Sequence, residues 1–370
     1  MIEIKPLEKA SGKVKIPGSK SYTNRALLIA ALAEGVSRLE NPLVSDDTKY
    51  MIQALKGFGI KVKEETNAFI VSGKGGKLKI PTEEIFVGNA GTTMRFLTTF
   101  AALTKGNVRL DGDERMQERP LADLLECLGQ MGVRATPAYH NGCPPVDIEG
   151  KGVPGGNITL AGNKSSQYLT SLLLSAPYFQ NDTNIFIQGD LTSKSYADIT
   201  LDIMQTFGIK VENDSYQEFS VRAGQIYKAR TYQIEGDWSS ATYFLAAAAV
   251  TGGDITLIGM NPTSVQGDAQ FADVLKKMGC EVHKSTDSLD LKGNSLKGIT
   301  INMNNMPDAV QTLAVVALFA KGETMIEGIG NLRIKETNRI EALANELKIL
   351  GAEVKTGEDF IIIRPSEYAG

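Results

Sequence analysis

Five stretches of the chain share one pattern: GFGIKV (57–62), QMGVRA (130–135), TFGIKV (206–211), KMGCEV (277–282) and ILGAEV (349–354). Each ends a run of residues with helical periodicity and begins a pair of strand-like segments. Their glycines, Gly59, Gly132, Gly208, Gly279 and Gly351, are separated by 73, 76, 71 and 72 residues. A glycine where a helix turns into a strand favours left-handed backbone geometry. So steady a period predicts a fold made by duplication of one supersecondary unit, with function at equivalent places in successive units.

The first repeat shows what one unit contains. It runs from PGSKSYTNRALLIAALAEG (17–35) through DDTKYMIQALKGFG (46–59) to IKVKEE (60–65) and AFIVSG (68–73). With a preceding strand, this order predicts a βαβαββ unit, and hence a mixed α/β (α+β) fold in which several such units pack together. The first 19 residues, MIEIKPLEKASGKVKIPGS, predict the hairpin half (residues 2–16) of a unit that lacks its helices.

Length and composition limit the class of protein. A chain of 370 residues is too long for one compact core and predicts two or more domains. The most apolar stretch, residues 241–250, is short for a membrane span, and the N-terminus has no signal-peptide core. The net charge of −4 makes nucleic acid an improbable partner, so any anion must be bound by locally placed basic groups.

Cysteine and histidine usage point to a reducing compartment and to chemistry without a metal. Cys127, Cys143 and Cys280 are odd in number and far apart, which indicates the cytoplasm rather than a disulfide framework. The two histidines, His140 and His283, have no second candidate ligand nearby in the sequence. We therefore expect neither a zinc site, nor a histidine-based triad, nor a cofactor.

Apolar helices with polar N-termini recur through the repeats. Residues 26–32, 243–250 and 313–319 are hydrophobic nearly all round, which predicts helices buried in the middle of a domain. The residues that precede them are small and polar, and taken singly each is well explained as a helix cap. Several buried helices of one orientation would nevertheless bring their positive ends together. The repeats thus predict a site for negatively charged ligands.

Basic and acidic residues stand at these same junctions. The basic ones are Lys20, Arg25, Arg95, Arg119, Lys164, Lys335 and Arg339. Lys20 lies between two serines at the start of an apolar helix, a context unlike that of a surface lysine such as Lys61. Asp308 and Glu336 occupy similar positions, and a carboxylate among cations can accept or donate a proton. For Asp308, a helix cap after Pro307 explains the residue equally well.

Six motifs in this chain resemble those of the 5-enolpyruvylshikimate-3-phosphate (EPSP) synthase family. The resemblance extends over the whole chain, in the family's motif order and spacing. The motifs are PGSKSYTNRALLIAALAEG (17–35), GNAGTTMR (88–95), DERMQERP (113–120), SSQYLTSLLLSAP (165–177), MPDAVQTLAVVALFAKG (306–322) and RIKETNRIEAL (333–343).

The resemblance implies a fold and an activity. The fold is a two-domain inside-out α/β barrel of six βαβαββ units with the active site in the cleft between the domains; this chain would supply five nearly complete units and an N-terminal hairpin. The implied activity is transfer of the enolpyruvyl group of phosphoenolpyruvate to the 5-hydroxyl of shikimate 3-phosphate, with release of phosphate. This reaction belongs to the shikimate pathway of aromatic amino acid biosynthesis, and glyphosate inhibits the family by occupying the phosphoenolpyruvate site.

The resemblance also implies the roles of individual residues. Lys20 would contact both substrates, while Asp308 and Glu336 would stand at the acid–base positions, with Asp308 also in contact with substrate. The remaining implied contacts are Ser21, Arg25, Ser165, Ser166, Gln167, Ser193, Tyr196, Asn331 and Lys335 for shikimate 3-phosphate, and Gly91, Arg119, Gln167 and Arg339 for phosphoenolpyruvate.

The motif order implies two lobes. Residues 20–236 would form a continuous lobe on the shikimate 3-phosphate side, and residues 1–19 with 237–370 a discontinuous lobe on the phosphoenolpyruvate and catalytic side. The sequence given ends at Gly370, before the family's late arginine and lysine. We therefore expect the discontinuous lobe to be incomplete at its C-terminal end, and a separate C-terminal fragment as a partner of an otherwise monomeric protein.

Three residues within the chain depart from the family pattern. Trp238 replaces a small residue at the expected hinge, Asn338 replaces an acid in KETNR, and Phe96 follows Arg95 where many members have proline. Because Phe96 adds bulk next to the phosphoenolpyruvate residues, we expect lower sensitivity to glyphosate than in a Phe96→Pro variant.

Two other functions stay open from the sequence. A sister enolpyruvyl transferase that acts on a UDP-amino sugar shares the fold but typically uses a cysteine on a mobile loop, whereas Cys127 falls in a predicted helix. A protein that binds shikimate 3-phosphate without turning it over would keep the substrate pocket and lack the sixth unit. Phosphate release, compared with simple binding, distinguishes these possibilities.

Overall fold

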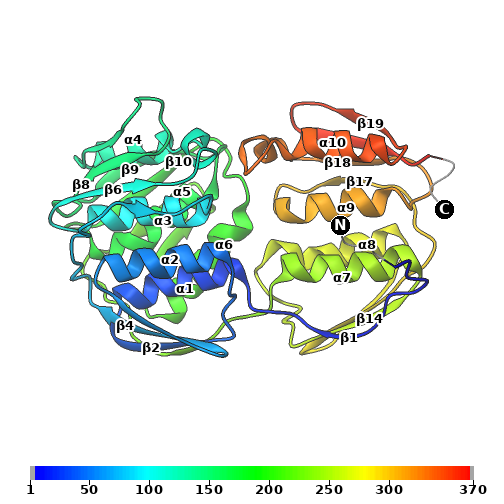
Figure 1. The fold of residues 1–370 in the computed structure, drawn as a ribbon, viewed down its shortest axis with the longest axis horizontal. Helices are drawn as coiled ribbons and strands as arrows, with labels where there is room; N and C mark the ends of the chain where they lie inside the picture. Colours follow the sequence, from blue (N-terminus) through cyan, green and yellow to red (C-terminus); the bar gives the residue numbers. More distant parts are fainter. Residues whose placement is uncertain (1–4, 367–370) are drawn as a thin grey trace. The chain divides into compact units, whose positions relative to one another are not determined.

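The computed structural model describes residues 5–366, which divide into two compact lobes (Figure 1). One consists of residues 18–234 and contains three four-stranded sheets; we call it the three-sheet lobe. The other consists of residues 5–17 and 235–366 and contains two such sheets; we call it the two-sheet lobe. The chain passes from one lobe to the other between residues 17 and 18 and again between 234 and 235.

All five sheets have the same topology, which confirms the βαβαββ repeat. In the unit that contains β9 (Gly156–Ala161), a helix leads to β10 (Thr183–Gln188), which pairs parallel to β9. A second helix leads to β11 (Val211–Asp214) and β12 (Glu218–Val221), and β12 pairs antiparallel to both β10 and β11. The other four sheets repeat this order. The fold is therefore mixed α/β.

The three-sheet lobe contains two further sheets and six α-helices. The strands of its first two sheets are β13 (Thr231–Gln233), β2 (Glu34–Glu40), β4 (Ala68–Lys74) and β3 (Lys61–Glu65), then β5 (Ile85–Phe86), β6 (Asn107–Asp111), β8 (Val146–Glu149) and β7 (Ala135–Pro137). The helices are α1 (Lys20–Leu32), α2 (Asp46–Gly57), α3 (Gly91–Ala102), α4 (Ala122–Gln130), α5 (Ser166–Ser175) and α6 (Lys194–Thr206), with the 3-10 helices η1 (Met116–Glu118) and η2 (Ala176–Tyr178).

The two-sheet lobe has the same units in smaller number. Its sheets are β1 (Ser11–Lys15), β14 (Asp254–Ile258), β16 (Ser288–Lys292) and β15 (Glu281–Lys284), then β17 (Thr300–Asn302), β18 (Thr324–Glu327), β20 (Phe360–Arg364) and β19 (Glu353–Thr356). Its helices are α7 (Trp238–Thr251), α8 (Phe271–Met278), α9 (Val310–Ala317) and α10 (Arg339–Ile349), with the 3-10 helices η3 (Gly267–Gln270), η4 (Pro307–Ala309) and η5 (Gly330–Ile334).

The repeated glycines adopt the backbone conformation that the sequence predicted. Gly59, Gly132, Gly208, Gly279 and Gly351 follow α2, α4, α6, α8 and α10, with φ angles of 82°, 76°, 90°, 128° and 88°. A side chain at Gly279 would also meet the carbonyl oxygen of Ser295. These positions require glycine because the chain must leave each helix in a conformation that other residues rarely adopt.

The N-terminal hairpin prediction is wrong for the part of the chain that can be tested. Residues 5–16 contain the single strand β1, which pairs parallel with β14 from Ser11–Asp254 to Lys15–Ile258; Figure 1 shows β1 in dark blue beside it. Residues 2–4 of the predicted hairpin lie outside the described range. The alternation in GKVKIP is that of any half-buried strand, so the sequence pattern could not identify a partner some 240 residues away. β1 is thus the leading strand of the fourth unit, as β13 is of the first.

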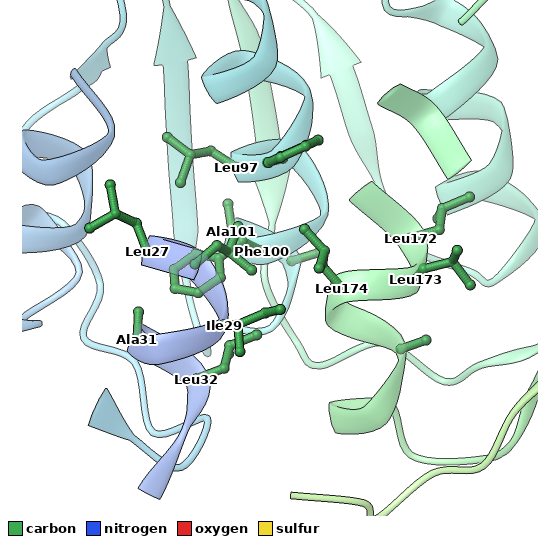
Figure 2. Close-up of a cluster of buried hydrophobic side chains, with 14 of the residues drawn as sticks. Leu27, Ile29, Ala31, Leu32, Leu97, Phe100, Ala101, Leu172, Leu173 and Leu174 are labelled. Carbon is green, nitrogen blue, oxygen red and sulfur yellow. The ribbon is translucent and has the colours of Figure 1, made fainter. Parts of the chain in front are cut away.

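The cores differ between the lobes. In the three-sheet lobe α1, α3 and α5 lie together, and Figure 2 shows Leu27, Ile29, Leu97, Phe100 and Leu174 of these helices in one buried cluster. The prediction of a buried helix over residues 26–32 is confirmed, because every one of those side chains is inaccessible.

For α7 and α9 the same prediction is only partly right. Tyr243 and Phe244 of α7, Val315 of α9 and Phe319 just beyond it are exposed, while the rest of both helices lies mostly in the core of the two-sheet lobe. No helix in residues 5–366 is both long and apolar enough to cross a membrane.

Candidate functional site

The helix starts of the three-sheet lobe are joined by a series of side-chain contacts. Lys20, the first residue of α1, lies with its Nζ 4.0 Å from Asp47 Oδ1 at the start of α2. Thr93 in the first turn of α3 donates a hydrogen bond to the Asp47 carbonyl, and Gln167 Nε2 in α5 donates to Thr92 Oγ1 at 3.2 Å. The N-termini of α1, α2, α3 and α5 therefore converge, as the repeats predicted for this lobe, where free N–H groups and helix dipoles favour an anion.

Arg25 lies directly beneath this region and is 2% exposed. Its guanidinium donates to Thr200 Oγ1 at 2.9 Å, Thr170 Oγ1 at 3.3 Å and the carbonyls of Ser21 and Tyr196 at 2.9 and 3.1 Å. Burial lowers the pKa of Arg25 to about 10, which still leaves a cation at neutral pH. Four of its five N–H groups are thus used within the protein. Arg25 fixes α1 to α5 and α6 and brings a buried positive charge beneath Ser21 and Tyr196.

The ring of Phe96 contributes to stabilising the buried positive charge of Arg25. Its ring is fully buried in α3, and the Arg25 guanidinium carbon lies 5.3 Å from the ring centroid. A cation over an aromatic face is stabilised by the ring quadrupole. The departure from proline at this position therefore supplies a contact to a candidate site residue.

Gly91 begins α3 where two arginines approach it closely. A Cβ on Gly91 would collide with the guanidinium groups of Arg119 and Arg95. Arg119 Nη1 donates to the carbonyl and the Oδ1 of Asn89, both at 3.0 Å, and Arg95 donates to the carbonyls of Gly91 and Pro120. Glycine is therefore needed here for close packing against two cations, which places positive charge at an N-terminus already favourable to anions.

The remaining candidates of this lobe occupy the starts of α5 and α6. Ser165 is the N-cap of α5, and its Oγ accepts a hydrogen bond from the Gln167 N–H at 3.2 Å. Ser166 is the first residue of α5. Ser193, the N-cap of α6, has a left-handed backbone (φ 55°), and Tyr196 lies in that helix's first turn. Capping thus accounts for Ser165, whereas the Ser193 side chain makes no capping bond in α6.

In the two-sheet lobe, Arg339 joins the two candidate acids. Its Nη1 lies 2.8 Å from Asp308 Oδ1 in η4, and its Nη2 lies 2.6 Å from Glu336 Oε2. Burial disfavours the charged guanidinium, but the attraction of Asp308 and then of Glu336 outweighs it and holds the pKa of Arg339 above its ordinary value. In the amide orientation that satisfies both of its groups, Gln311 also accepts from Arg339. These residues form one acid–base cluster, which we call the Arg339 cluster.

The Arg339 cluster supplies a partner for Asp308 other than the N-terminus of α9. The N-cap position of α9 is occupied by Ala309, whereas the Asp308 carboxylate bonds to Arg339. Asn338 caps α10, accepting from the Glu341 N–H at 3.3 Å, so the substitution of an acid by Asn338 preserves the cap. Asn331 lies within η5, and Lys335 directly follows it. Asp308, Glu336 and Arg339 are brought together, and Lys335 is adjacent to Glu336 in the chain.

A buried carboxyl that sequence reasoning missed lies next to this cluster. Asp268, in η3, is 5% exposed and accepts a hydrogen bond from Ser239 in the first turn of α7. In the sequence it precedes an amphipathic helix and resembles an ordinary capping residue. The only earlier signal was its position at a helix start equivalent to those already singled out.

Three surface cavities lie elsewhere in the molecule. Their volumes are about 450, 300 and 580 Å³, and none of the three is lined by a candidate site residue. Within residues 5–366 no group of three His, Cys, Asp or Glu side chains is arranged to hold a metal ion. The candidate site is therefore defined by side-chain chemistry at helix starts rather than by these three cavities.

Repeated βαβαββ units that present basic and acidic side chains at the starts of their helices define the class: a mixed α/β protein with helix N-termini suited to small anions. The sequence model of EPSP synthase (3-phosphoshikimate 1-carboxyvinyltransferase) matches residues 4–369. The chain therefore belongs to the EPSP synthase family, which is a family of transferases.

Individual relatives agree with this assignment. Proteins named 3-phosphoshikimate 1-carboxyvinyltransferase from Sulfurovum sp. and Marinomonas sp. are 47% and 46% identical, with 98% of this chain and 86% of each relative covered. A solved structure of EPSP synthase from Acinetobacter baumannii is 28% identical, with a TM-score of 0.79 over 97% of this chain and 82% of that one.

Proposed function

We propose that this protein transfers the enolpyruvyl group of phosphoenolpyruvate to the 5-hydroxyl of shikimate 3-phosphate and releases phosphate, as the names of its relatives indicate for them. The observation that carries the proposal is the Arg339 cluster, with an arginine bound to two carboxylates at 2.8 and 2.6 Å in the motif positions of this family. We further propose a cytoplasmic location, which the three free cysteines of the described residues support.

In the proposed reaction the 5-hydroxyl oxygen bonds to C2 of phosphoenolpyruvate while C3 takes up a proton. Asp308 accepts the hydroxyl proton, and Glu336 or Lys20 delivers the proton to C3. The tetrahedral adduct then loses a C3 proton as its C2–O bond to phosphate breaks, which releases phosphate and restores the double bond. Because Arg339 binds both acids, their ionisations are coupled, and the protons belong to the pair rather than to either residue alone.

We assign one substrate mainly to each of the two parts of the chain. We assign residues 20–236 to the shikimate 3-phosphate side and residues 1–19 with 237–370 to the phosphoenolpyruvate and catalytic side. The proposed contacts of shikimate 3-phosphate are Lys20, Ser21, Arg25, Ser165, Ser166, Gln167, Ser193, Tyr196, Asn331 and Lys335, and those of phosphoenolpyruvate are Lys20, Gly91, Arg119, Gln167 and Arg339. For Arg25 the proposal is mainly indirect, since four of its N–H groups already have protein partners.

The UDP-amino sugar reaction is disfavoured by the environment of Cys127. This cysteine is buried in α4, and burial, followed by Glu126 and Asp123, raises the pKa of its thiol to about 12. A thiol of that pKa is almost wholly protonated at neutral pH and is a poor nucleophile or acid catalyst.

A paired measurement separates enzyme from binding protein. Phosphate release from the two substrates is followed for the protein, for Asp308→Asn and for the control Asp273→Asn. Asp273 is outside the Arg339 cluster, and its carboxylate lies 2.8 Å from Lys284 Nζ. Asp308→Asn should lose phosphate release while retaining shikimate 3-phosphate binding, and Asp273→Asn should retain both. If all three bind shikimate 3-phosphate and none releases phosphate in any assembly, the binding-protein alternative is correct.

The exposed face of α7 and α9 supports a second part of the proposal. The repeats align on the helix ends LAEG (32–35), LTKG (103–106), VTGG (250–253) and FAKG (319–322). In this alignment Tyr243, 64% exposed, stands where Phe96 is fully buried, and Val315, 46% exposed, stands where Thr99 is fully buried. In the three-sheet lobe these positions are covered because α5 packs against α3.

We propose that a further βαβαββ unit, equivalent to the C-terminal segment of the family, covers Tyr243, Phe244, Val315 and Phe319 in the active protein. Burying each of these large side chains would stabilise the assembly by about 1.5–3 kcal/mol. The test adds the C-terminal segment of the Sulfurovum relative to residues 1–370 and follows binding and phosphate release. Binding that Tyr243→Glu abolishes and the equally exposed Tyr139→Glu leaves intact supports the proposal; no binding, or full activity of the chain alone, overturns it.

A further inference from the structure

Asp268 is a buried carboxyl that forms no ion pair with any residue in the range 5–366. Ser239 donates a hydrogen bond to its Oδ2, and its Oδ1, which is inaccessible to solvent, accepts no hydrogen bond. A carboxylate taken out of water without compensation is costly, and the common response is to bind a proton. As a carboxylic acid, Asp268 needs only one partner for its O–H group, and the Ser239 oxygen can accept that hydrogen bond.

The neighbours of Asp268 are acidic on two sides. η3 packs against α7, α8 and η4. α7 contributes Asp237 at its N-cap, which accepts from Ser240, and η4 contributes Asp308. Of the charged residues on α8, Asp273 is bound to Lys284, and Lys276 and Lys277 are exposed. Glu235, in the segment before α7, accepts a hydrogen bond from Nε2 of Gln266, two residues before Asp268.

The direction of the titration follows from this arrangement. Burial, followed by repulsion from Asp308 and then Asp237, raises the pKa of Asp268 to about 8, and the Ser239 hydrogen bond opposes this only partly. Asp308 is paired with the cation Arg339, whereas the Asp268 carboxyl is bonded to the neutral Ser239. Arg339 therefore stabilises a negative charge on Asp308, whereas a negative charge on the neighbouring Asp268 would have no such stabilisation.

We propose that Asp268 is a positioning residue for Asp308: as a neutral carboxylic acid bound to Ser239, it packs behind the catalytic carboxylate and lets Asp308 alone carry charge beside Arg339. This inference rests on the proposed function for its catalytic part. Ionisation of Asp268 would place two buried negative charges together, which would weaken the Asp308–Arg339 pair on which proton transfer depends.

Trp238 offers a readout that is independent of turnover. It is the only tryptophan of the chain, it is buried, and it directly precedes Ser239, the hydrogen-bond partner of Asp268. Its backbone N–H donates to Gln266 Oε1, two residues before Asp268, and its indole N–H donates to the carbonyl of Asn261. Its fluorescence should therefore report the charge of Asp268. We expect a fluorescence transition with a midpoint near pH 8, absent in Asp268→Asn and moved to higher pH in Ser239→Ala, because the serine hydroxyl favours the ionised form. The control Asp273→Asn should leave the midpoint unchanged.

The catalytic part has a separate test. At pH 7 Asp268→Ala should lower kcat about tenfold, because Asp308 loses the group that packs behind it, with little change in KM, and Asp268→Asn should recover most of that loss. Asp268→Asn should also remove the alkaline limb of the kcat–pH profile near pH 8.

The outcomes are distinguishable. A transition only near pH 4, where an ordinary aspartate titrates, overturns the neutral acid. A transition near pH 8 with identical kcat–pH profiles for the protein and Asp268→Asn overturns the positioning role and leaves the proposed function intact. If the protein shows no turnover with its C-terminal segment present, the proposed function fails, and the fluorescence titration still decides the ionisation of Asp268.

Discussion

The two lobes are built from the same βαβαββ unit, yet their central helices are buried to different degrees. In the three-sheet lobe α1, α3 and α5 cover one another, and Phe96 is inaccessible. In the two-sheet lobe α7 packs against α8 and α9, and α9 packs also against α10. Tyr243 of α7, at the position equivalent to Phe96, is nevertheless 64% exposed. A helix that is apolar on all sides therefore predicts that other elements pack around it, and its side chains are buried only where those elements are present.

The largest expected effect is on catalysis and sharpens the difference in role between the lobes. Asp308→Ala, Glu336→Ala and Lys20→Ala should each lower kcat by roughly 10²–10⁴-fold in a complete assembly, the range for a positioned acid or base. Ser166→Ala, at the start of α5 in the three-sheet lobe, should instead act mainly on KM for shikimate 3-phosphate. Steady-state kinetics with both substrates varied measures these effects. Near-normal kcat for any of the first three removes that residue from the mechanism.

The next prediction compares equivalent core positions. Phe96→Ala should cost about 3–5 kcal/mol of stability in the three-sheet lobe, the usual cost of removing a buried phenylalanine. Tyr243→Ala in the isolated chain should change stability by no more than about 0.5 kcal/mol, as for other surface substitutions. Because a chain with two compact lobes need not unfold in a single transition, amide hydrogen exchange in α3 and α7 is the suitable measurement. Equal costs at the two positions would mean that the face of α7 and α9 is already covered.

A third prediction uses the pH dependence of the two-sheet lobe. The pKa of Asp268 is about 8 in the folded protein and near 4 when unfolded, so the folded state binds more protons between these values. Stability contributed by this group is full below the unfolded pKa and falls as pH rises toward 8, by at most about 1.4 kcal/mol per pH unit. Asp268→Asn should therefore become more stable relative to the protein as pH increases from 5 to 8. A constant difference over that range would contradict the raised pKa.

The smallest effect concerns helix caps, one in each lobe. Asn338 accepts from the Glu341 N–H at the start of α10, so Asn338→Ala should cost about 0.5–2 kcal/mol. Ser19, at the N-cap of α1, makes no side-chain capping bond, and its buried hydroxyl has no hydrogen-bond partner. Ser19→Ala should thus be neutral or slightly stabilising. Thermal denaturation of the two variants side by side would show whether the caps of the two lobes differ in this way.

The repeat could be predicted from sequence because its determinants are local. The glycine that ends each second helix must adopt a left-handed conformation, and the alternation of the following strands is visible within a few residues. The partner of β1 could not be predicted, because β1 precedes the first unit in the sequence but pairs with β14 of the fourth unit. In the same way β13 precedes the fourth unit but pairs with β2 of the first. Exposure of Tyr243 was missed for a related reason: composition fixes the apolarity of a helix and not the presence of its neighbours.

The site was predictable to the extent that it lies in motifs. Lys20, Gly91 and Asp308 stand out as unusual residues at helix starts. The hydrogen bonds that hold Arg25 to Thr200 and Thr170, and the contact between Ser239 and Asp268, join segments distant in the chain. Sequence periodicity carries no information on such contacts, so the supporting residues emerged only from the three-dimensional structure.

Phosphate release from phosphoenolpyruvate and shikimate 3-phosphate tests the central claim most directly. The measurement compares residues 1–370 alone, the same chain with the C-terminal segment of the Sulfurovum relative, and each mixture with one substrate omitted. We predict that phosphate release requires both substrates and occurs in equal amounts with formation of the enolpyruvyl product. Binding of shikimate 3-phosphate without phosphate release in every mixture would contradict the proposed reaction, and full release by residues 1–370 alone would contradict the need for a sixth unit.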